Sequence, residues 1–471
     1  MNASKENKKE AVKFLTLFDR SGIHMKASKY NFFFPYESDE NKIIAYNSYS
    51  NALALMEKCK YDVFQQFVNN GVPIVDNEFI AQLKQGCFLI DSDVNELDWI
   101  RLRMLQSRFN TDSLGLTIIP TADCNFRCPY CYEKDVIRPE YMTAEVEEAT
   151  IKLAELYMRT IVNLNVTWYG GEALMNIEAV DRLSKKLIAM CDEHNVNYKA
   201  YMVTNGYLLT KEIAQQLTEL KIDLLQITLD GCDDAHNQRR PLADGSGTFF
   251  VIIENLINCK DVMPPVSLRI NIDKYNTTSG ADVTRLLDEN GLLGKVSPYI
   301  SKVFHGNDSH NKASCFDACS FSSEEVKYFN EFASDETYMK YYPKPIRNYC
   351  GADSLNSYVI AADGKIYKCW HDVGSDIKHI GSLIESIDTK ESAYLQYMLF
   401  DPTADTRCSE CNLLPICMGG CPYNRVDRDG DVCTTHKFVL DDFLTVIAKK
   451  LKLRKGLAEN ASISNDIILE I

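Results

Sequence analysis

The chain has 471 residues, 45% of them apolar, and a formal net charge of -15. This length predicts two or three domains with full-sized cores. The acidic balance argues against binding to nucleic acid or to anionic membranes. The charged residues at the start are followed by no apolar signal segment, and no apolar run approaches the length of a membrane span. These features predict a cytoplasmic location.

The first hundred residues predict a small domain of strands and helices. Strands are expected at residues 29–34 and 42–46, with a short third strand at 88–90. Helices are expected around 53–55 and over 61–69, 78–85 and 95–109. We assign residues 1–110 to this domain, with a winged-helix-like fold.

The next two hundred residues alternate between strand and helix patterns. Helical periodicity is clear over 144–159, where Thr143 is the expected N-cap, and over 211–221 and 249–258. Alternation of this kind predicts a parallel sheet with right-handed crossovers. We therefore predict an α/β fold, a partial (β/α)6 barrel of TIM type over residues 111–310. The six expected strands span residues 115–119, 164–169, 200–204, 223–229, 266–272 and 299–304, the last beginning just after Pro298.

Three cysteines, Cys124, Cys128 and Cys131, follow the first of these strands. Three closely spaced thiolates can hold three corners of a four-iron cubane cluster and leave one iron without a protein ligand. A zinc site is the alternative, but zinc takes four ligands, and no His or Cys follows within fifty residues. Because the chain has 17 cysteines and no export signal, metal or cluster ligation fits better than a disulfide scaffold.

The spacing C-x3-C-x2-C, with Tyr130 just before the last cysteine, resembles the signature of the radical S-adenosylmethionine (SAM) enzymes. The resemblance implies that the open iron is chelated by the amino and carboxylate groups of SAM. One electron, from an external donor of flavodoxin or ferredoxin type, then cleaves SAM to a 5′-deoxyadenosyl radical.

Further family elements fall at the ends of the later strands. Gly170, Gly171 and Glu172 resemble the Gly-Gly-Glu element that receives the methionine ammonium; glycines permit close approach, and a carboxylate pairs with a cation. The segment from Thr204 through Asn205 to Gly206 also resembles a family element. Arg269 and Asn271, on the fifth strand, are also expected to face the cofactor.

The stretch from Thr228 to Arg240 resembles the segment that holds the methionine carboxylate, which implies that role for both residues. An arginine suits it because its fork grips a carboxylate with two bonds. The stretch departs from the family pattern in two places, with Thr228 in place of serine and Asn237 in place of aspartate. The neighbouring Arg239 leaves the register of the arginine open. Glu133 and Asp230 are candidates for a catalytic base by position.

A second cysteine array lies downstream, in residues 350–433. Its spacings resemble the SPASM motif of radical SAM enzymes that modify peptides and proteins. A zinc ribbon is the structural alternative, but one zinc needs four thiolates and the array supplies more. The resemblance implies two auxiliary [4Fe-4S] clusters and hence three clusters in all. The seven cysteines of the array are Cys350, Cys369, Cys408, Cys411, Cys417, Cys421 and Cys433.

The family pattern assigns Cys408, Cys411, Cys417 and Cys433 to a distal cluster. It assigns Cys350, Cys369 and Cys421 to a proximal cluster, which lacks a fourth ligand. Sulfatase maturases place an additional cysteine where this chain has Lys344. Either Cys315 or Cys319 completes the site, or the iron is open and can bind a substrate thiolate.

The resemblance as a whole implies a radical SAM peptide maturase with a SPASM domain. The expected partner is a cysteine-containing precursor peptide with a leader, held by domain 1–110. We expect residues 311–349 to bridge, 350–440 to form the SPASM domain and 441–471 to form a helix and tail. The favoured product is a cysteine thioether. The alternatives are formylglycine formation, as in sulfatase maturases, a carbon–carbon crosslink, and an iron–sulfur electron carrier without radical chemistry.

Overall fold

The computed structural model describes residues 25–303, 314–334, 338–385, 391–427, 432–457 and 468–470. The chain divides into two compact units. The first comprises residues 1–99, 343–345 and 448–471, and the second comprises residues 100–342 and 346–447. None of the helices in the described part is both long enough and apolar enough to cross a membrane.

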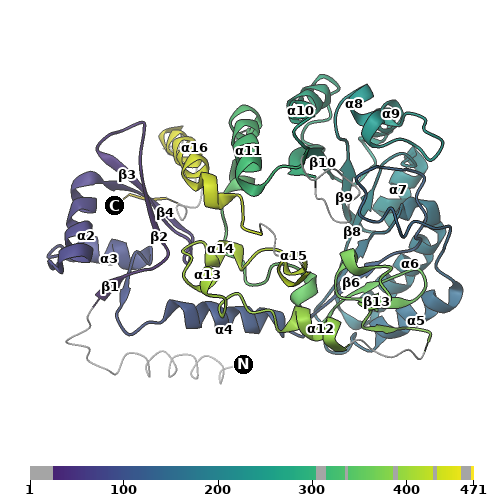
Figure 1. Ribbon diagram of the computed structural model, residues 1–471, viewed down its shortest axis with the longest axis horizontal. Helices are drawn as coiled ribbons and strands as arrows, with labels where there is room; N and C mark the ends of the chain where they lie inside the picture. Colours follow the sequence, from purple (N-terminus) through teal and green to yellow (C-terminus); the bar gives the residue numbers. More distant parts are fainter. Residues whose placement is uncertain are drawn as a thin grey trace. The chain divides into compact units, whose positions relative to one another are not determined.

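The first unit is built on a sheet in the order β15-β4-β3-β2 (Figure 1). The helices α2 and α3 follow β4, and their apolar faces pack on it through Phe64, Phe79 and Leu83. The strands are β1 (Met25–Ala27), β2 (Asn31–Pro35), β3 (Lys42–Asn47), β4 (Ala52–Glu57), β5 (Leu89–Asp91) and β15 (Ile468–Glu470), and the helices are α2 (Lys58–Asn70), α3 (Asn77–Gln85) and the first residues of α4 (Glu96–Arg108).

One prediction for this unit is wrong. Residues 53–55 belong to the strand β4, not to a helix. A short turn after Asn47 returns the chain antiparallel to β3, and Leu53 pairs with Tyr46 across the hairpin. The apolar run of β4 is buried on both faces, so it lacks the alternation that marks a half-buried strand.

The second unit contains a nine-stranded sheet in the order β11-β10-β9-β8-β7-β6-β12-β13-β14. All neighbours from β6 to β11 run parallel, which confirms the predicted α/β barrel portion. Its strands are β6 (Ser113–Ile118), β7 (Asn163–Trp168), β8 (Asn197–Thr204), β9 (Ile222–Thr228), β10 (Val266–Ile272) and β11 (Val296–Lys302), and its helices are α5 (Ala144–Glu155), α6 (Ile177–His194), α7 (Lys211–Glu219), α8 (Asp233–Arg239), α9 (Phe249–Cys259) and α10 (Ser279–Glu289).

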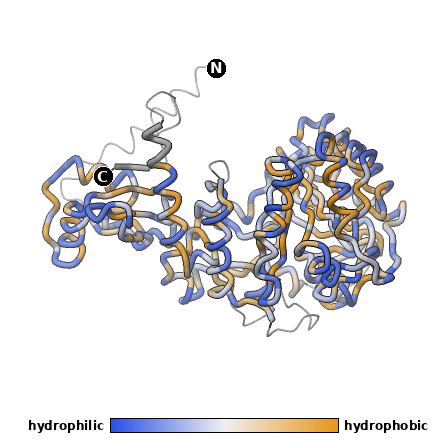
Figure 2. The backbone as a smooth tube through the Cα atoms, turned by 90° about the horizontal axis from the view of Figure 1, so that it is seen from above, coloured by the Kyte–Doolittle hydropathy of each residue, from blue (hydrophilic) through white to orange (hydrophobic). Residues whose placement is uncertain are grey.

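The parallel strands pack against the helices on one face and enclose the site on the other. In β6 and β7 every second residue is buried, and these residues form the core with α5 and α6. Figure 2 shows apolar segments, in orange, interspersed with hydrophilic ones, in blue, along the chain. The Thr143 side chain caps α5 by accepting from the N–H of Val146, as expected.

The last barrel strand begins earlier than predicted. Pro298 lies within β11, which spans Val296–Lys302. Because β11 is at the edge of the sheet, a proline that lacks an N–H is tolerated there. Phe304, the predicted end of this strand, lies outside the described residues.

The cysteine-rich region continues the barrel sheet. The strand β12 (Ser357–Ile360) pairs parallel to β6, and β13 (Lys365–Tyr367) and β14 (Gly381–Ser382) extend the sheet antiparallel. This pairing connects the two cysteine arrays through a shared sheet, which the sequence did not predict. The remaining helices are α11 (Ala318–Phe332), α12 (Glu391–Met398), α13 (Thr406–Ser409), α14 (Leu414–Cys417), α15 (Pro422–Asp427) and α16 (His436–Leu457).

Candidate active site

The loop after β6 brings Cys124, Cys128 and Cys131 to one cavity of about 300 Å³ at the carboxyl ends of the parallel strands. The pKa of the Cys131 thiol is raised to about 12, mainly by burial and to a smaller extent by the charges of Glu133 and Cys128. Burial also raises the pKa of Cys124 and of Cys128. Crowded, buried thiols of this kind ionise only next to compensating positive charge, and bound iron supplies that charge.

Gly170 and Gly171 bring the end of β7 against the cysteine loop. A Cβ atom at Gly171 would lie 2.1 Å from the carbonyl oxygen of Asp123, and Gly170 has a φ of 123°. The N–H of Gly171 donates to Thr121 at 3.3 Å, and that of Glu172 donates to Asp123 at 2.8 Å. The glycines therefore permit a backbone-to-backbone contact that fixes the loop, while both still line the cavity.

The carboxylate of Glu172 is held from three sides. It accepts from Thr204 Oγ1 at 2.7 Å, from the N–H of Asn205 at 2.7 Å and from the N–H of Leu174 at 3.0 Å. The side chain is 2% exposed, and burial raises the pKa of its carboxyl. A cation in the cavity would favour the ionised form, which suits the predicted role toward an ammonium.

The two neighbouring arginines face in different directions. Arg240 lines the cavity, and its Nε has no hydrogen-bond partner among the described residues. Arg239 turns away and pairs with Asp273 at 2.8 Å and with Asp230 at 3.5 Å. The structure therefore places Arg240, and not Arg239, beside the cavity, together with Thr228.

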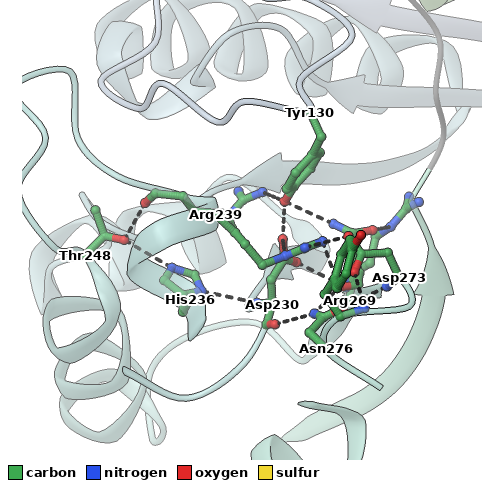
Figure 3. Close-up of polar contacts among 11 residues, drawn as sticks. Tyr130, Asp230, His236, Arg239, Thr248, Arg269, Asp273 and Asn276 are labelled. Atoms are coloured by element: carbon green, nitrogen blue, oxygen red, sulfur yellow. Dashed lines mark hydrogen bonds and ion pairs between the residues drawn. The ribbon is translucent and has the colours of Figure 1, made fainter. Parts of the chain in front are cut away.

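Tyr130 connects this cavity to a buried polar network (Figure 3). Its hydroxyl donates to the carboxylate of Asp230 and accepts from Arg240 Nη1 at 2.9 Å. Asp230 also accepts from the N–H of Asn271 at 3.1 Å. Because Asp230 is fully buried behind Tyr130 and does not line the cavity, its position favours a supporting role over that of a base.

His236 is part of the same support. Its Nδ1 accepts from the N–H of Asp230 at 3.1 Å, and its Nε2 lies 3.1 Å from Thr248 Oγ1. The pKa of this imidazole is lowered to about 3, mainly by burial and to a smaller extent by the charge of Arg240. The ring is therefore neutral, and it fixes the backbone at the end of β9.

The other predicted cofactor residues also reach the cavity. Asn205 lines it and donates from Nδ2 to Asn125 Oδ1 in the cysteine loop at 2.7 Å. Arg269 lines it too, with Nε donating to Asn271 Oδ1 at 2.8 Å. The structure thus brings together all eight predicted cofactor residues. They are Tyr130, Gly170, Gly171, Glu172, Asn205, Thr228, Arg240 and Arg269.

Glu133 lines the cavity, unlike Asp230. Burial raises the pKa of its carboxyl to about 7. A carboxylate with this pKa is suited to accept a proton near neutral pH.

An aromatic wall borders the cavity on the side of the cysteine-rich region, and sequence reasoning missed it. Tyr169 stacks on Trp370 with ring centroids 4.8 Å apart, and Tyr132 lies 4.2 Å from His371. Trp370 and His371 follow Cys369 directly. The chain has only three tryptophans, and Trp370 directly follows the candidate ligand Cys369. This position was the signal in the sequence that could have pointed to an aromatic contact at the site.

Several cysteines of the second array lie close enough to raise one another's pKa. Cys350 and Cys421 both raise the pKa of Cys369, after the larger effect of burial. Cys411 and Cys433 likewise raise the pKa of Cys417, after the larger effect of burial. Cys411 and Cys417 also raise the pKa of Cys408. The assignment of these cysteines to a proximal and a distal cluster stays a prediction.

Cys315 and Cys319 lie near the start of α11. Cys315 is buried, and its pKa is affected by the charges of Asp273 and Lys274, which follow β10. Cys319 is exposed. Within the described ranges, no three His, Cys, Asp or Glu side chains converge as ligands of one metal ion. In a cubane cluster each cysteine binds a different iron, so its ligands need not converge on a point.

Comparison with known proteins agrees with this geometry. Residues 118–284 match the sequence model of the Radical SAM superfamily. A serine-type anaerobic sulfatase-maturating enzyme of Bacteroides thetaiotaomicron is 23% identical over 358 residues, which cover 66% of this chain and 82% of that protein. A cysteine-type anaerobic sulfatase-maturating enzyme of Clostridium novyi is 23% identical over 382 residues, which cover 73% of this chain and 99% of that protein.

The fold has a solved counterpart. The structure titled native anSMEcpe with bound AdoMet and Kp18Cys peptide superposes with a TM-score of 0.56 at 17% identity, covering 73% of this chain and 99% of that one. The superposition shows a shared fold. This chain carries a radical SAM domain, and the anaerobic sulfatase-maturating enzymes are its homologues. The family implies SAM and a [4Fe-4S] cluster as cofactors.

Proposed function

We propose that this protein is a radical SAM peptide maturase that forms a cysteine thioether in a precursor peptide. The observation that carries the proposal is one cavity in which Cys124, Cys128 and Cys131 face Glu172 and Arg240. Three thiolates, an anion and a cation are the groups needed to hold a cluster and the two charged ends of an amino acid. An electron carrier has no use for the last two.

Each residue then has a defined task. Cys124, Cys128 and Cys131 would hold the cluster, Glu172 would bind the methionine ammonium of SAM and Arg240 would bind its carboxylate. The loaded cofactors supply the one-electron cleavage of SAM that starts hydrogen abstraction from the peptide. Glu133, which lines the same cavity, accepts a proton from the substrate.

A route for the peptide is supported by a second cavity of about 860 Å³ along the outer strand β11. Tyr299 lines this cavity and donates from its hydroxyl to Gln226 Oε1 at 3.3 Å. Gln226 lines the cysteine cavity. A peptide lying along β11 would therefore reach the cysteine cavity past one hydrogen-bonded pair of side chains.

The thioether rests on the ligand count of the second array. Cys350, Cys369 and Cys421 would hold a proximal cluster with three protein ligands, and Cys408, Cys411, Cys417 and Cys433 would complete a distal one. The location of Cys315 near Asp273 and Lys274 supports a proximal cluster with one iron left open, to which a peptide thiolate would bind. If one iron of the proximal cluster is open, the Cys315→Ser and Cys319→Ser variants should each bind as much iron as the native protein. Loss of one cluster's iron in either variant would contradict the open site.

Formylglycine formation is the second candidate. The similarity to serine-type and cysteine-type sulfatase-maturating enzymes favours it. Lys344, where those enzymes are expected to carry another cysteine, weighs against it.

The deciding experiment uses anaerobically reconstituted protein with SAM and dithionite. Formation of 5′-deoxyadenosine is expected, and it is expected to stop in Cys128→Ala. Peptides from small reading frames beside the gene are then tested by mass spectrometry with thiol alkylation. A product that loses hydrogen and one alkylatable thiol supports the thioether, whereas an aldehyde trapped by hydrazine supports formylglycine. Intact clusters without 5′-deoxyadenosine would refute both.

A further inference from the structure

The turn that joins two cysteines of the second array, residues 417–421, is left-handed over three consecutive positions. Met418, Gly419 and Gly420 have φ values of 47°, 82° and 76°. Glycine adopts this conformation without strain, whereas other residues rarely do. A Cβ atom at Gly420 would lie 2.1 Å from the carbonyl oxygen of Val432. The missing side chain therefore lets the turn pack against the segment that leads to the next cysteine of the array.

The turn brings the cysteines expected at the distal cluster within reach of one another. Burial raises the pKa of Cys417, and Cys433 and Cys411 raise it too, by a smaller amount. Cys417 and Cys411 act in the same way on Cys408. Four thiolates this close are a donor set that fits one four-iron cluster, in which each cysteine binds a different iron.

Arg425, on α15, uses all three guanidinium nitrogens beside this donor set. Its Nη2 donates to Cys408 Sγ at 3.2 Å, and its Nε donates to the carbonyl oxygen of Gly419, in the left-handed turn, at 2.6 Å. Its Nη1 lies 3.6 Å from the carboxylate of Asp405, and the side chain is 8% exposed. The positive charge is thus held in one orientation against the sulfur, with little access to water.

The neighbouring charges leave this region positive. The carboxylate of Asp405 also pairs with Arg407 at 2.9 Å, so two arginines share one anion. A further cation, Lys437, donates from Nζ to Cys433 Sγ at 3.5 Å. This second contact to a sulfur is exposed, so water and salt weaken its effect. Arg425 is therefore the cation that acts most strongly on the sulfurs.

We propose that Arg425 is a positioning residue that raises the reduction potential of the cluster expected at Cys408. The potential of an iron–sulfur cluster depends on its net charge and on hydrogen bonds to its sulfurs. A cation that donates to a cysteine sulfur stabilises the reduced state, because that state is the more negative one. The presence of this cluster rests on the proposed function.

The same function supplies the electron that Arg425 would stabilise. When a carbon radical of the peptide joins a thiolate, one C–S bond forms and one electron is released. The electron converts one ferric iron to ferrous, and no proton moves. It then leaves to the external carrier of flavodoxin or ferredoxin type that the sequence predicts. A higher potential beside Arg425 favours this transfer away from the peptide.

The test is a redox titration monitored by electron paramagnetic resonance. It uses the full, cluster-loaded chain in which Cys124, Cys128 and Cys131 are replaced by alanine, so that the first cluster contributes no signal. The distal signal is the one that a further Cys408→Ala change removes. In Arg425→Gln, the ratio of reduced to oxidised distal cluster at a fixed potential should fall at least ~10-fold, which is a midpoint lower by ~59 mV for one electron.

Arg407→Gln is the matched control. Arg407 binds the same carboxylate as Arg425, but its side chain is 69% exposed, so the ratio should change less than ~2-fold. Arg425→Lys keeps the charge and loses the fork, so its midpoint should lie between those of the native chain and Arg425→Gln. Lys437→Gln should lower the midpoint less than Arg425→Gln does.

Iron content separates a purely structural role from the proposed one. If Arg425→Gln loses the distal cluster, the titration of Arg425→Lys decides. An unchanged midpoint at full iron content would overturn the proposal, and so would a native chain in which Cys408→Ala removes no signal. The titration needs neither SAM nor peptide, so its outcome is independent of 5′-deoxyadenosine formation, on which the proposed function depends.

Discussion

Thr204 donates a 2.7 Å hydrogen bond to the carboxylate of Glu172, from the end of the neighbouring strand. The N–H of the next residue, Asn205, donates to the other carboxylate oxygen. Adjacent parallel strands thus fix the orientation of one anion at the carboxyl edge of the sheet. A preoriented carboxylate loses little entropy when it binds a cation, which makes Glu172 the strongest test of the cofactor site.

Glu172→Gln is expected to weaken SAM binding. The amide keeps the size of the side chain but removes the charge, and a hydrogen bond to a charged group contributes about 1.5–3 kcal/mol, equivalent to a loss of roughly tenfold or more in affinity. Equilibrium dialysis with labelled SAM measures this. Glu178→Gln, on the surface-facing first turn of α6, is the control and should bind normally. Equal affinity in both variants would remove Glu172 from the site.

The two arginines are expected to separate cofactor binding from stability. Arg240→Lys should lower SAM affinity without loss of iron, because a lysine cannot form two parallel bonds to a carboxylate. Arg239→Ala should instead destabilise the fold by about 3 kcal/mol, since it leaves Asp273 buried without its ion pair. Thermal melting and SAM dialysis on both variants check this assignment. It fails if Arg239→Ala loses SAM affinity while its melting temperature is unchanged.

Glu133→Gln is expected to uncouple SAM cleavage from product formation. If Glu133 accepts the substrate proton, 5′-deoxyadenosine still forms, and the modified peptide falls by about 100-fold. Because the pKa of Glu133 is raised to about 7, peptide modification by the native protein should rise with pH through that value. Product analysis by mass spectrometry measures both. Asp230→Asn, which disturbs Tyr130 instead, should reduce SAM cleavage as well.

The sequence predicted which residues meet in the cavity better than it predicted their surroundings. Spacing alone placed Cys124, Cys128 and Cys131 together, because all three lie within one short loop after β6. Trp370 was missed because its contact with Tyr169 depends on the pairing of β12 with β6, which brings residues two hundred positions apart together. The edge pairing of β15 was missed for the same reason.

The pH dependence of stability should report the neutral state of His236. Burial lowers the folded-state pKa of this ring to about 3, whereas an unfolded histidine titrates near 6.5. Between these values the unfolded chain binds more protons, so the free energy of unfolding falls as the pH falls below about 6.5, by up to about 1.4 kcal/mol per pH unit. His236→Asn cannot titrate there. Melting temperatures from pH 7 to pH 5 should decline less steeply in this variant than in the native protein, and parallel declines would contradict the assignment.

Gly171→Ala is expected to abolish assembly of the first cluster. An added Cβ would lie 2.1 Å from the Asp123 carbonyl oxygen, so the backbone of the cysteine loop must move away from the end of β7. This backbone contact precedes Cys124 directly, and a displaced loop no longer presents three thiolates to one cluster. Gly381→Ala is the matched control, because a Cβ there meets nothing within 4 Å. Iron analysis and Mössbauer spectra should show one cluster fewer in Gly171→Ala than in Gly381→Ala, and equal iron in the two would show that the loop tolerates the shift.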